Sequence, residues 1–354
     1  MRVVIISIFF ISLLLFSSVY LSPEYLDYTG LLPLLIPLFI LLNLFLVVLL
    51  LFGKTRLILY PLLALAIGWR FLVITFQWND QEPDKEGLSL MSFNTMLFNH
   101  HWDQGEIAKN AIQWANENPA DIKCFQEFYQ DFTTPSRNAL KILSDNGRYE
   151  YAFQAVDGNP KKKFYGIAIF SKYPIINEGK VFDNRKNNGA MFADIKIDKD
   201  TIRVYNTHLE SMSIVTKELN NLEGIRSQYR QTIRKLKEGI QMRARQTRIL
   251  KEHMEKSPYP VLLVGDFNDL PYSHTYFSLR GSFNNAFEEA GRGFGFTYNK
   301  VLFFLRIDNI FFDDFFQVHH FKTHREVDYS DHYPISAIFT YPGSQSINGP
   351  VLDQ

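Results

Sequence analysis

The first 78 residues are almost wholly apolar, and this composition separates them from the rest of the 354-residue chain. Three apolar segments lie there, at about residues 3–21, 31–52 and 57–77. Each is close to the ~20 residues that a helix needs to cross about 30 Å of hydrocarbon. We therefore expect three transmembrane helices that form an anchor over residues 1–78. For the first segment alone, the alternative is a cleavable signal peptide.

The charged residues around these segments predict an orientation. Arg2 precedes the first segment, and Lys54 and Arg56 lie in the short loop before the third. The loop between the first two segments carries Glu24 and Asp27 but no basic residue. Because short cytoplasmic loops are enriched in Lys and Arg, three crossings would place the rest of the chain outside the cytoplasm. The sequence thus predicts a multi-pass protein of the cytoplasmic (inner) membrane with an extracytoplasmic domain.

The remainder of the chain has an ordinary soluble composition. A polar linker at residues 79–87 precedes a single domain at 88–341, and a flexible tail follows at 342–354. Once the four basic and two acidic residues of the anchor are set aside, 33 basic and 35 acidic residues remain. A dedicated high-affinity DNA-binding protein usually shows a clear basic excess, so this balance disfavours that class.

Short apolar runs alternate with amphipathic segments through the domain, which predicts an α/β fold. Segment 217–256 holds eleven basic and five acidic residues, which fits either a solvated helix face or an arm that attracts phosphate. Its Gly224 and Gly239 predict a bend or a break. We expect strands at 88–94, 122–126, 149–153, 166–171, 190–197, 202–207, 261–265, 306–312 and 334–341, and helices at 104–117, 135–145, much of 216–256 and just after Ser273.

Polar side chains follow the ends of these predicted strands. The clearest example is the apolar run 261–264, which ends in Gly265 and then presents Asp266 and Asn268. Carboxylates are hard oxygen ligands suited to Mg²⁺, Mn²⁺ or Ca²⁺, and histidines transfer protons near neutral pH. The full set at strand ends is Asn94, Glu127, His208, Asp266, Asn268, Asp308, Asp331 and His332.

Several other chemistries lack their motifs in this sequence. It contains no cysteine cluster or His-Glu-x-x-His helix for zinc, no Gly-x-x-x-x-Gly-Lys-Ser/Thr loop for nucleotide hydrolysis, and no Gly-x-Ser-x-Gly elbow. The acids, amides and imidazoles that remain suit a metal-assisted attack of water on a phosphate ester.

The motifs that carry these residues resemble, in order, those of the endonuclease/exonuclease/phosphatase superfamily, also called deoxyribonuclease-I-like or exonuclease III-like. The resemblance covers about residues 88–341, and an anchor followed by this domain looks like a membrane-bound bacterial branch. It implies a four-layer α/β sandwich of two mixed β-sheets flanked by helices. The motifs are Met91-Ser92-Phe93-Asn94, Cys124-Phe125-Gln126-Glu127, Asn206-Thr207-His208-Leu209, Gly265-Asp266-Phe267-Asn268, Arg306-Ile307-Asp308-Asn309-Ile310 and Ser330-Asp331-His332.

The resemblance also implies a Mg²⁺ or Mn²⁺ site. Glu127 would bind the cation, with Asn94 close by. Asp331 would lie at the metal or the phosphate, and Asp266 would serve the metal as well as the catalytic step.

The same resemblance implies catalytic roles for the remaining residues. His332 would activate water, and Asp308 would orient its ring. Asp266 and Asn268 would hold the nucleophile and the phosphate, with Asp331 beside them. His208 would stabilise the phosphate or protonate the leaving oxygen.

Two features near these motifs leave alternatives open. Many relatives carry an arginine just before the strand that begins at Gly189, where this chain has Asn187 and Asn188 with Arg185 earlier. A phosphate-clamping arginine is therefore in doubt. The loop 293–298 resembles a family loop near the site, but it also fits a purely structural turn.

The sequence predicts a membrane-anchored, divalent-metal-dependent phosphoesterase. The alternative from another class is a catalytically silent membrane sensor of a phosphorylated ligand. Motifs for shared phosphate chemistry do not choose among nucleic acid, nucleotide and lipid headgroup substrates, so nuclease and sphingomyelinase-like activities both stay open. No obligate protein partner is evident in the sequence.

Overall fold

The computed structural model describes residues 1–26, 28–53, 55–102, 105–183, 188–211, 222–300, 302 and 304–342. The chain forms two compact units. We call Met1–Phe76, Glu210–Thr247 and Asp269–Gly281 the helical unit. We call Gln77–Leu209, Arg248–Asn268 and Ser282–Gln354 the two-sheet unit.

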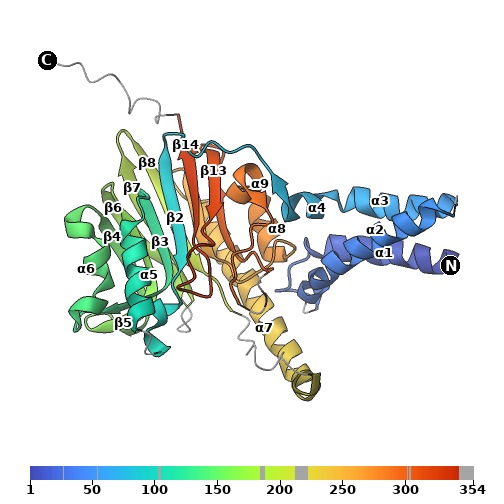
Figure 1. Cartoon of the computed structure of the whole chain (residues 1–354), viewed down its shortest axis with the longest axis horizontal. Helices are drawn as coiled ribbons and strands as arrows, with labels where there is room; N and C mark the ends of the chain where they lie inside the picture. Colours follow the sequence, from blue (N-terminus) through green and yellow to red (C-terminus); the bar gives the residue numbers. More distant parts are fainter. Residues whose placement is uncertain are drawn as a thin grey trace. The chain divides into compact units, whose positions relative to one another are not determined.

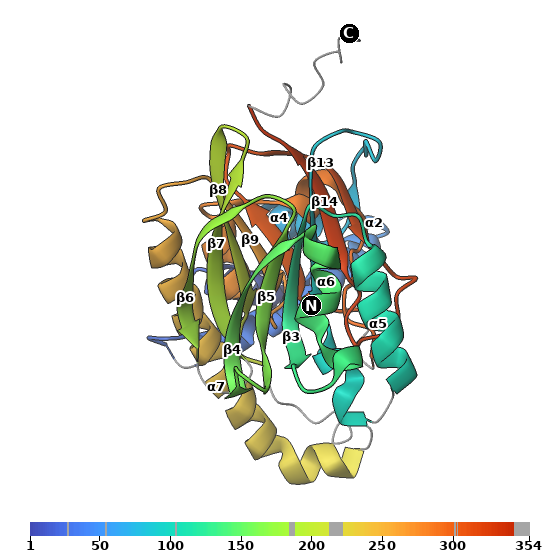
Figure 2. The same ribbon diagram turned by 90° about the vertical axis from the view of Figure 1, so that its left-hand side faces the viewer.

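Two six-stranded sheets, each of mixed direction, build the two-sheet unit, and Figure 2 shows them face to face. In the first sheet β2 and β3 are parallel and the other pairs antiparallel; in the second only β8 and β9 are parallel. The first, in the order β13-β14-β2-β3-β5-β4, contains β2 (Leu88–Asn94), β3 (Ile122–Asp131), β4 (Glu150–Asn159), β5 (Lys163–Ser171), β13 (Gln317–Thr323) and β14 (Ile335–Thr340). The second, in the order β10-β12-β9-β8-β7-β6, contains β6 (Ile175–Asp183), β7 (Gly189–Ile197), β8 (Asp200–His208), β9 (Val261–Asp266), β10 (Asn284–Asn285) and β12 (Asp308–Phe312).

Side chains alternate along the strands and so build two apolar layers. On β2, Leu90 joins the core between the sheets, whereas Phe93 joins the layer under the helices. The first layer also contains Ile169, Val204 and Val264, all fully buried. This alternation is why both faces of a central strand such as β2 are apolar.

Helices cover the outer faces of both sheets. Helices α5 (Gly105–Glu117) and α6 (Ala139–Leu143) pack on the first sheet through the second apolar layer. The last turns of α7 (Leu222–Met254) cover the second sheet, where the Tyr205 hydroxyl lies 2.8 Å from His253 Nδ1. The expected architecture, two mixed sheets flanked by helices, is confirmed. Short elements complete the unit: η3 (Met96–Trp102), η4 (Pro135–Arg137), η5 (Asp145–Gly147), α9 (Ala286–Ala290), β1 (Gln77–Trp78) and β11 (Arg292–Gly293).

A buried polar clamp joins the two sheets. Gln126 on β3 donates from Nε2 to Asn206 Oδ1 on β8 at 2.6 Å. Asn206 in turn donates from Nδ2 to the carbonyl oxygens of Phe125 and Ala168, at 2.9 Å each. Because buried polar groups are costly unless paired, these bonds favour one relative placement of the sheets.

Each of the nine expected strands is present, but β6 and β13 were not expected. Both are edge strands, and their polar sequences give little apolar alternation because only part of each strand is covered. The basic segment forms one continuous helix, α7, through Gly224 and Gly239, and Figure 2 shows that this helix is bent, so of the two expectations the bend is seen and the break is not. The expected helix at 135–145 is three short pieces, η4, α6 and η5.

The helical unit consists largely of apolar helices. Asn43 on α2 donates to Ser12 Oγ on α1 at 2.8 Å, and both residues are buried. Phe16 packs against Phe71 with ring centroids 5.2 Å apart. The elements are α1 (Arg2–Ser18), η1 (Thr29–Leu35), α2 (Ile36–Leu51), η2 (Arg56–Ile58), α3 (Leu59–Ile67), α4 (Trp69–Thr75) and α8 (His274–Arg280), the last capped by Ser273 (Figure 1).

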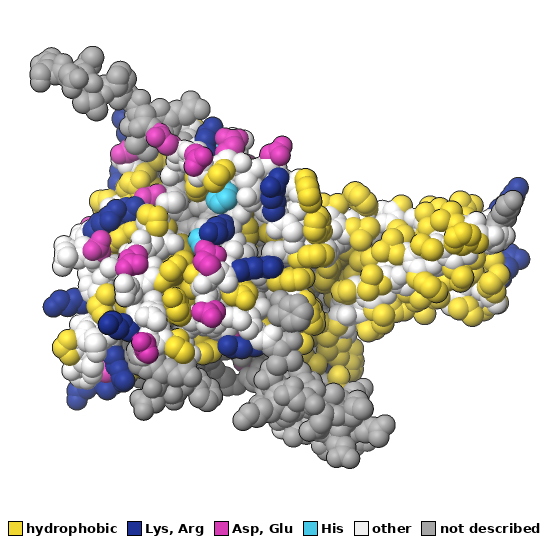
Figure 3. Space-filling view, viewed as in Figure 1, with side chains coloured by type: hydrophobic (Ala, Val, Ile, Leu, Met, Phe, Trp, Pro, Cys, Tyr) yellow, Lys and Arg dark blue, Asp and Glu magenta, His cyan; other side chains and the backbone are white. Residues whose placement is uncertain are grey.

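The expectation of three full spans needs correction. Within the described residues, one helix, Thr29–Leu51, is long and apolar enough to cross a membrane. The third segment is broken at Gly68, so that Arg56–Ile67 and Trp69–Thr75 meet at 54° and qualify only when taken together. The first, α1, ends at Ser18 after 17 residues. Figure 3 shows hydrophobic side chains over the surface of α1–α3.

Candidate active site

Three of the predicted site residues meet through strand register in the second sheet. His208 at the end of β8 pairs with Asp266 on β9, and Asp266 pairs with Asp308 on β12. Gly265, next to Asp266, has φ +140°, and a Cβ there would lie 1.9 Å from the carbonyl oxygen of Thr207. Glycine is therefore required for the strands to approach closely enough to align these side chains.

The first sheet contributes Asn94 and Glu127. Glu127 lies where β3 shifts register against β5, and its φ is +46°. A bulge of this kind re-aims a side chain, and strained non-glycine backbone is often found at functional sites. Asn94 ends β2, and its amide oxygen accepts a hydrogen bond from Met96 N at 3.1 Å. Its amide nitrogen is thereby left to face the acids.

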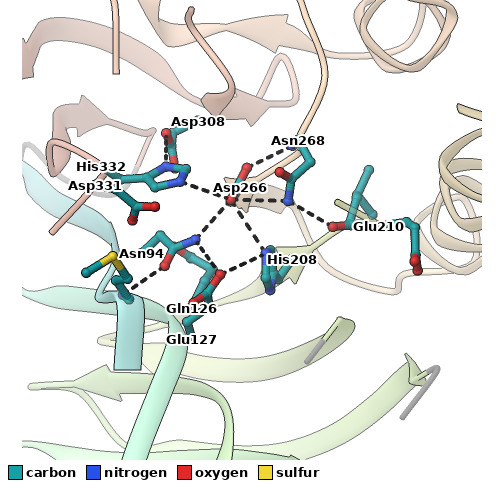
Figure 4. A network of polar contacts seen from close by, with 12 residues as sticks. Asn94, Gln126, Glu127, His208, Glu210, Asp266, Asn268, Asp308, Asp331 and His332 are labelled. Atoms are coloured by element: carbon teal, nitrogen blue, oxygen red, sulfur yellow. Dashed lines mark hydrogen bonds and ion pairs between the residues drawn. The ribbon is translucent and has the colours of Figure 1, made fainter. Parts of the chain in front are cut away.

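The Asp266 carboxylate is the centre of the cluster (Figure 4). Its Oδ2 accepts from Asn94 Nδ2 at 3.0 Å, and it lies 3.5 Å from His208 Nε2 and 3.6 Å from His332 Nε2. Glu127 Oε1 lies 3.5 Å from the same Asn94 nitrogen and 3.7 Å from the same His208 nitrogen. Two carboxylates from different sheets thus converge on shared donors.

Asn268 lies two residues beyond the end of β9 and also faces Asp266. Its backbone N donates to Asp266 Oδ1 at 2.8 Å, and its φ is +50°. Its side-chain Nδ2 donates to the carbonyl oxygen of Leu209 at 3.0 Å. In return, Leu209 N donates to the carbonyl oxygen of Asp266 at 2.9 Å. These bonds tie the chain after His208 to the chain after Asp266.

His332 and Asp308 form a buried pair at the other side of Asp266. His332 Nδ1 lies 2.9 Å from Asp308 Oδ2, which leaves Nε2 directed at Asp266. Thr297 Oγ1 accepts from Asp308 N at 3.2 Å, and the Tyr298 ring packs edge-on against the His332 ring. A carboxylate on one nitrogen fixes the ring orientation and tautomer of the histidine.

Asp331 and its neighbour Ser330 complete the group. Ser330 is buried, and its Oγ donates to the carbonyl oxygen of Asn94 at 2.7 Å and accepts from His332 N at 3.2 Å. Asp331 is partly exposed, and its charge acts on both Glu127 and His332. The loop that carries Asp331 and His332 is thus fastened to the end of β2.

Burial and the nearby carboxylates shift the pKa values of Glu127 and His332. Burial raises the pKa of Glu127 above its ordinary value; Asp331 and Asp266 raise it further, while His208 and His332 oppose the rise. Burial disfavours the charged His332 ring, but Asp308 and Asp266 outweigh it and raise the pKa of His332 well above its ordinary value. A neighbouring carboxylate raises the pKa of another carboxyl group and of an imidazole, because it disfavours a second negative charge and favours a positive one.

The donor set fits a hard divalent cation. Glu127, Asp266 and Asp331 offer carboxylate oxygens, which Mg²⁺ and Mn²⁺ prefer. Among the described residues, the group whose possible ligand atoms all lie within 4.8 Å of one another is Asp266, Asp308 and His332, but Asp308 and His332 are already bonded to each other. The predicted ligand Asn94 presents its amide nitrogen to the acids and therefore acts here as a hydrogen-bond donor.

All eight predicted site residues are brought into one cluster. The sequence reasoning missed the supporting residues Thr297, Ser330 and Gln126, although each lies within or beside a quoted motif. Of the open alternatives, the loop 293–298 lies at the site through Thr297 and Tyr298. The question of a clamping arginine concerns Arg185 and Asn187, which lie outside the described residues.

Sequence comparisons give two matches to family models. The model of the Endonuclease/Exonuclease/phosphatase family matches residues 91–332. A separate model, of a domain of unknown function, matches residues 2–75. A search of the curated proteins finds no match.

Solved structures share the fold of the two-sheet unit. An endonuclease/exonuclease/phosphatase family protein from Leptotrichia buccalis has a TM-score of 0.51 at 15% identity, and the match covers 72% of this chain and 100% of that one. A mannosyl-6-phosphatase from Bacteroides thetaiotaomicron has a TM-score of 0.51 at 18% identity with the same coverage. A Neisseria 3′ phosphatase bound to a product DNA hairpin has a TM-score of 0.50 at 18% identity, again with 72% and 100% covered.

Proposed function

This chain belongs to the endonuclease/exonuclease/phosphatase family, and from that premise we propose that it is a divalent-cation-dependent phosphoesterase. The observation that carries the proposal is the convergence of Glu127 and Asp266 on the same Asn94 and His208 nitrogens. Two carboxylates that face each other repel unless a cation or a proton lies between them.

In this proposal Glu127, Asp266 and Asp331 hold the cation. When bound, the cation supplies positive charge to the phosphoryl oxygens and lowers the pKa of a bound water. Asn94 Nδ2 orients both Glu127 and Asp266, at 3.5 and 3.0 Å. Partners of this kind hold ligating carboxylates in place and are important for affinity.

His332 and His208 divide the proton transfers. In its neutral form, His332 would accept the proton of the attacking water at Nε2, because Asp308 holds Nδ1 and supports the charge that develops on the ring. His208 lies on the far side of Asp266 and donates to a phosphoryl oxygen or to the leaving oxygen. Asn268, with Asp266, orients the nucleophile and the phosphate.

Hydrolysis of bis-p-nitrophenyl phosphate by the purified full chain tests this proposal. We expect turnover that EDTA abolishes and that Mn²⁺ or Mg²⁺ restores. His332→Ala should lose almost all of it. Turnover that persists in EDTA, or in His332→Ala, would contradict the assignment, and cation-dependent phosphate binding with no turnover would favour the silent sensor.

The helical unit serves as a membrane anchor in our proposal. Its outward side chains are apolar, for example Leu41 and Phe45, which are 63% and 61% exposed. Arg2 and Arg56 line one cavity of about 620 Å³, so the start of α1 and the start of α3 lie at one end of the helices. By the positive-inside rule that end is cytoplasmic.

From that end the bent pair Arg56–Ile67 and Trp69–Thr75, taken as one span, would carry the chain that follows it to the extracytoplasmic side. Helix α1, at 17 residues, would be about 26 Å long, slightly less than the hydrocarbon thickness. Carbonate extraction of membranes tests the anchor, and protease treatment of spheroplasts tests the side. Release of the chain by carbonate would overturn the anchor, while full protection from protease would overturn only the orientation.

The family and the site residues support phosphate esters as the general class of substrate and do not select one kind of phosphate ester. Nucleic acids, nucleotides and lipid headgroups are all within the proposal, and the solved relatives include a sugar phosphatase and a DNA 3′ phosphatase. A panel of DNA, a free nucleotide, sphingomyelin and phosphoinositides, presented to the full chain with Mn²⁺, separates these classes. A single preferred class would identify the enzyme as a nuclease or a lipid phosphodiesterase.

A further inference from the structure

A buried arginine on α7 contacts the two segments that follow the catalytic strand ends. Arg243 is fully buried, and its Nε lies 3.1 Å from Asp269 Oδ2. The same guanidinium donates from its Nη1 atom to the carbonyl oxygen of Glu210 at 2.9 Å. Asp269 directly follows Asn268 in the chain, and Glu210 directly follows Leu209.

The next turn of α7 completes the grip on Glu210. Gln246 lies three residues after Arg243, on the same face of the helix, and its Oε1 accepts from Glu210 N at 2.8 Å. Both backbone groups of Glu210 are therefore held by one face of α7. Glu210 is connected to the site through its neighbour Leu209. The backbone N of Leu209 donates to the carbonyl oxygen of Asp266, and its carbonyl oxygen accepts from Asn268 Nδ2.

A buried arginine with these partners is expensive to keep for stability alone. Removing a guanidinium from water costs several kcal/mol, and a buried ion pair often contributes no more stability than apolar residues of the same shape. What the arginine provides is a fixed position for its partners, since the planar guanidinium group holds its N–H donors in defined directions. Here Nη1 donates to the carbonyl oxygen of Glu210, next to Leu209, and Nε forms an ion pair with Asp269, next to Asn268.

The segment that begins at Asp269 is also fastened at its far end. Its Tyr272 hydroxyl lies 2.6 Å from Thr75 Oγ1, and its Phe277 ring packs on Phe71 at 5.3 Å. His274 Nδ1 lies 3.0 Å from the carbonyl oxygen of Val19. The segment is thus held between α7 and the N-terminal helices within the helical unit.

We propose that Arg243 is a positioning residue for the active site, acting through Asp269 and Glu210 on the loop that carries Asn268 and on the loop that follows His208. This inference rests on the proposed phosphoesterase function but adds a residue that contacts no reacting atom. Without the guanidinium, both loops lose a fixed point immediately beside the site. Misplacement by about 1 Å is enough to slow a reaction about 100-fold.

Kinetics of full-chain variants test the inference with bis-p-nitrophenyl phosphate and Mn²⁺. We expect Arg243→Gln to lower kcat about 30- to 100-fold and to change KM much less. Arg243→Lys should recover part of kcat because it keeps the charge opposite Asp269. Arg234→Gln is the matched control, since Arg234 lies on the same helix with a 69% exposed side chain, and it should leave kcat unchanged.

Hydrogen exchange supplies a readout that does not depend on turnover. The amides of Leu209 and Asn268 should exchange faster in Arg243→Gln than in Arg234→Gln, because both residues lie in the loops that Arg243 holds and both amides donate to Asp266 at the end of β9. If Arg243→Gln does not fold, Arg243→Lys and Asp269→Asn carry the same comparison. Unchanged kcat, or unchanged exchange at both amides, would overturn the positioning role. A wild-type chain with no turnover would overturn the proposed function, while the exchange data would still decide whether Arg243 orders the loops.

Discussion

The helical unit and the two-sheet unit place the same kinds of side chain in opposite ways. In the two-sheet unit the aliphatic residues are inside, as at Ile169 and Val264, and buried polar groups such as Asn206 join in networks. In the helical unit large apolar residues such as Leu41 are outside. The difference teaches that the two regions suit different solvents, because apolar surface of this extent is not stable in water.

The comparison also separates what each region can do. A site that gathers acids and imidazoles needs rigid elements and satisfied partners, and the two-sheet unit provides both. On α2, the bond from Asn43 to Ser12 of α1 is flanked by buried apolar residues such as Ile40 and Leu46. This contrast supports our proposals that the apolar helices are an anchor and that the two-sheet unit holds the active site.

The largest expected effect is on the chemistry of the two-sheet unit. Asp266→Asn should lower kcat/KM by about 10³-fold or more, because this carboxylate faces both histidines and Asn94. Asp314→Asn is the control. Asp314 is an exposed carboxylate that accepts a hydrogen bond from Asn284 Nδ2. Steady-state hydrolysis with Mn²⁺ measures both, and equal loss in the two variants would show that the cluster is not the site.

The second effect is on the stability of the same unit. Asn206→Leu removes the donor to Phe125 and Ala168 and the acceptor of Gln126. Groups left buried without a partner cost about 1–3 kcal/mol each, so we expect a loss of about 3 kcal/mol. That corresponds to a fall in Tm of roughly 6–12 °C for a domain of this size, measured on the full chain in detergent. A fall of less than about 2 °C would mean that the clamp does not matter.

A third effect uses a buried charge in the two-sheet unit. Lys123 donates to the carbonyl oxygens of Ala115 and Asn116 at 2.9 and 3.2 Å, and burial lowers its pKa to about 8. Between pH 8 and the ordinary lysine pKa the unfolded chain binds the extra proton, so this residue makes folding more favourable as pH rises. The slope is at most about 1.4 kcal/mol per pH unit.

Lys123→Met is the variant that measures this slope. The stability of the wild type relative to Lys123→Met should rise from pH 8 to 10, as followed by Tm. Lys161→Met, at an exposed lysine, should show no such rise. A flat difference for Lys123→Met would indicate that the buried amine keeps an ordinary pKa.

The smallest effect is expected in the helical unit. Asn43→Leu removes the bond to Ser12, and such bonds between helices in a membrane average only about 0.6 kcal/mol. We therefore expect a change in Tm much smaller than that of Asn206→Leu, although both remove a buried asparagine. A large loss for Asn43→Leu would break the contrast between the two units and indicate that the helices depend on polar packing.

The parts that the sequence could predict are those that local pattern decides. A continuous run of apolar residues predicts a central strand such as β9, and the polar residues that follow such strands predict the site. The edge strands β6 and β13 were missed because one side of each is uncovered. The helix break at Gly68 was also missed, since apolarity alone gives length and not direction.

The supporting residues of the site could not be predicted for a different reason. Thr297 supports Asp308, and Gln126 meets Asn206 from 80 residues away. Arg243 reaches Asp269 and Glu210 from a helix whose sequence reads as a basic surface. Such roles depend on which side chains tertiary packing brings together, and no spacing along the chain encodes that.

The central claim is that Glu127 and Asp266 hold a divalent cation that phosphate-ester hydrolysis requires. Mn²⁺ binding by electron paramagnetic resonance, measured on the same full-chain samples whose turnover is assayed, tests it most directly. We predict that wild type binds Mn²⁺ tightly and that Glu127→Gln loses tight binding and turnover together. Full turnover in a Glu127→Gln sample that no longer binds Mn²⁺, or unchanged Mn²⁺ binding in that variant, would contradict the account.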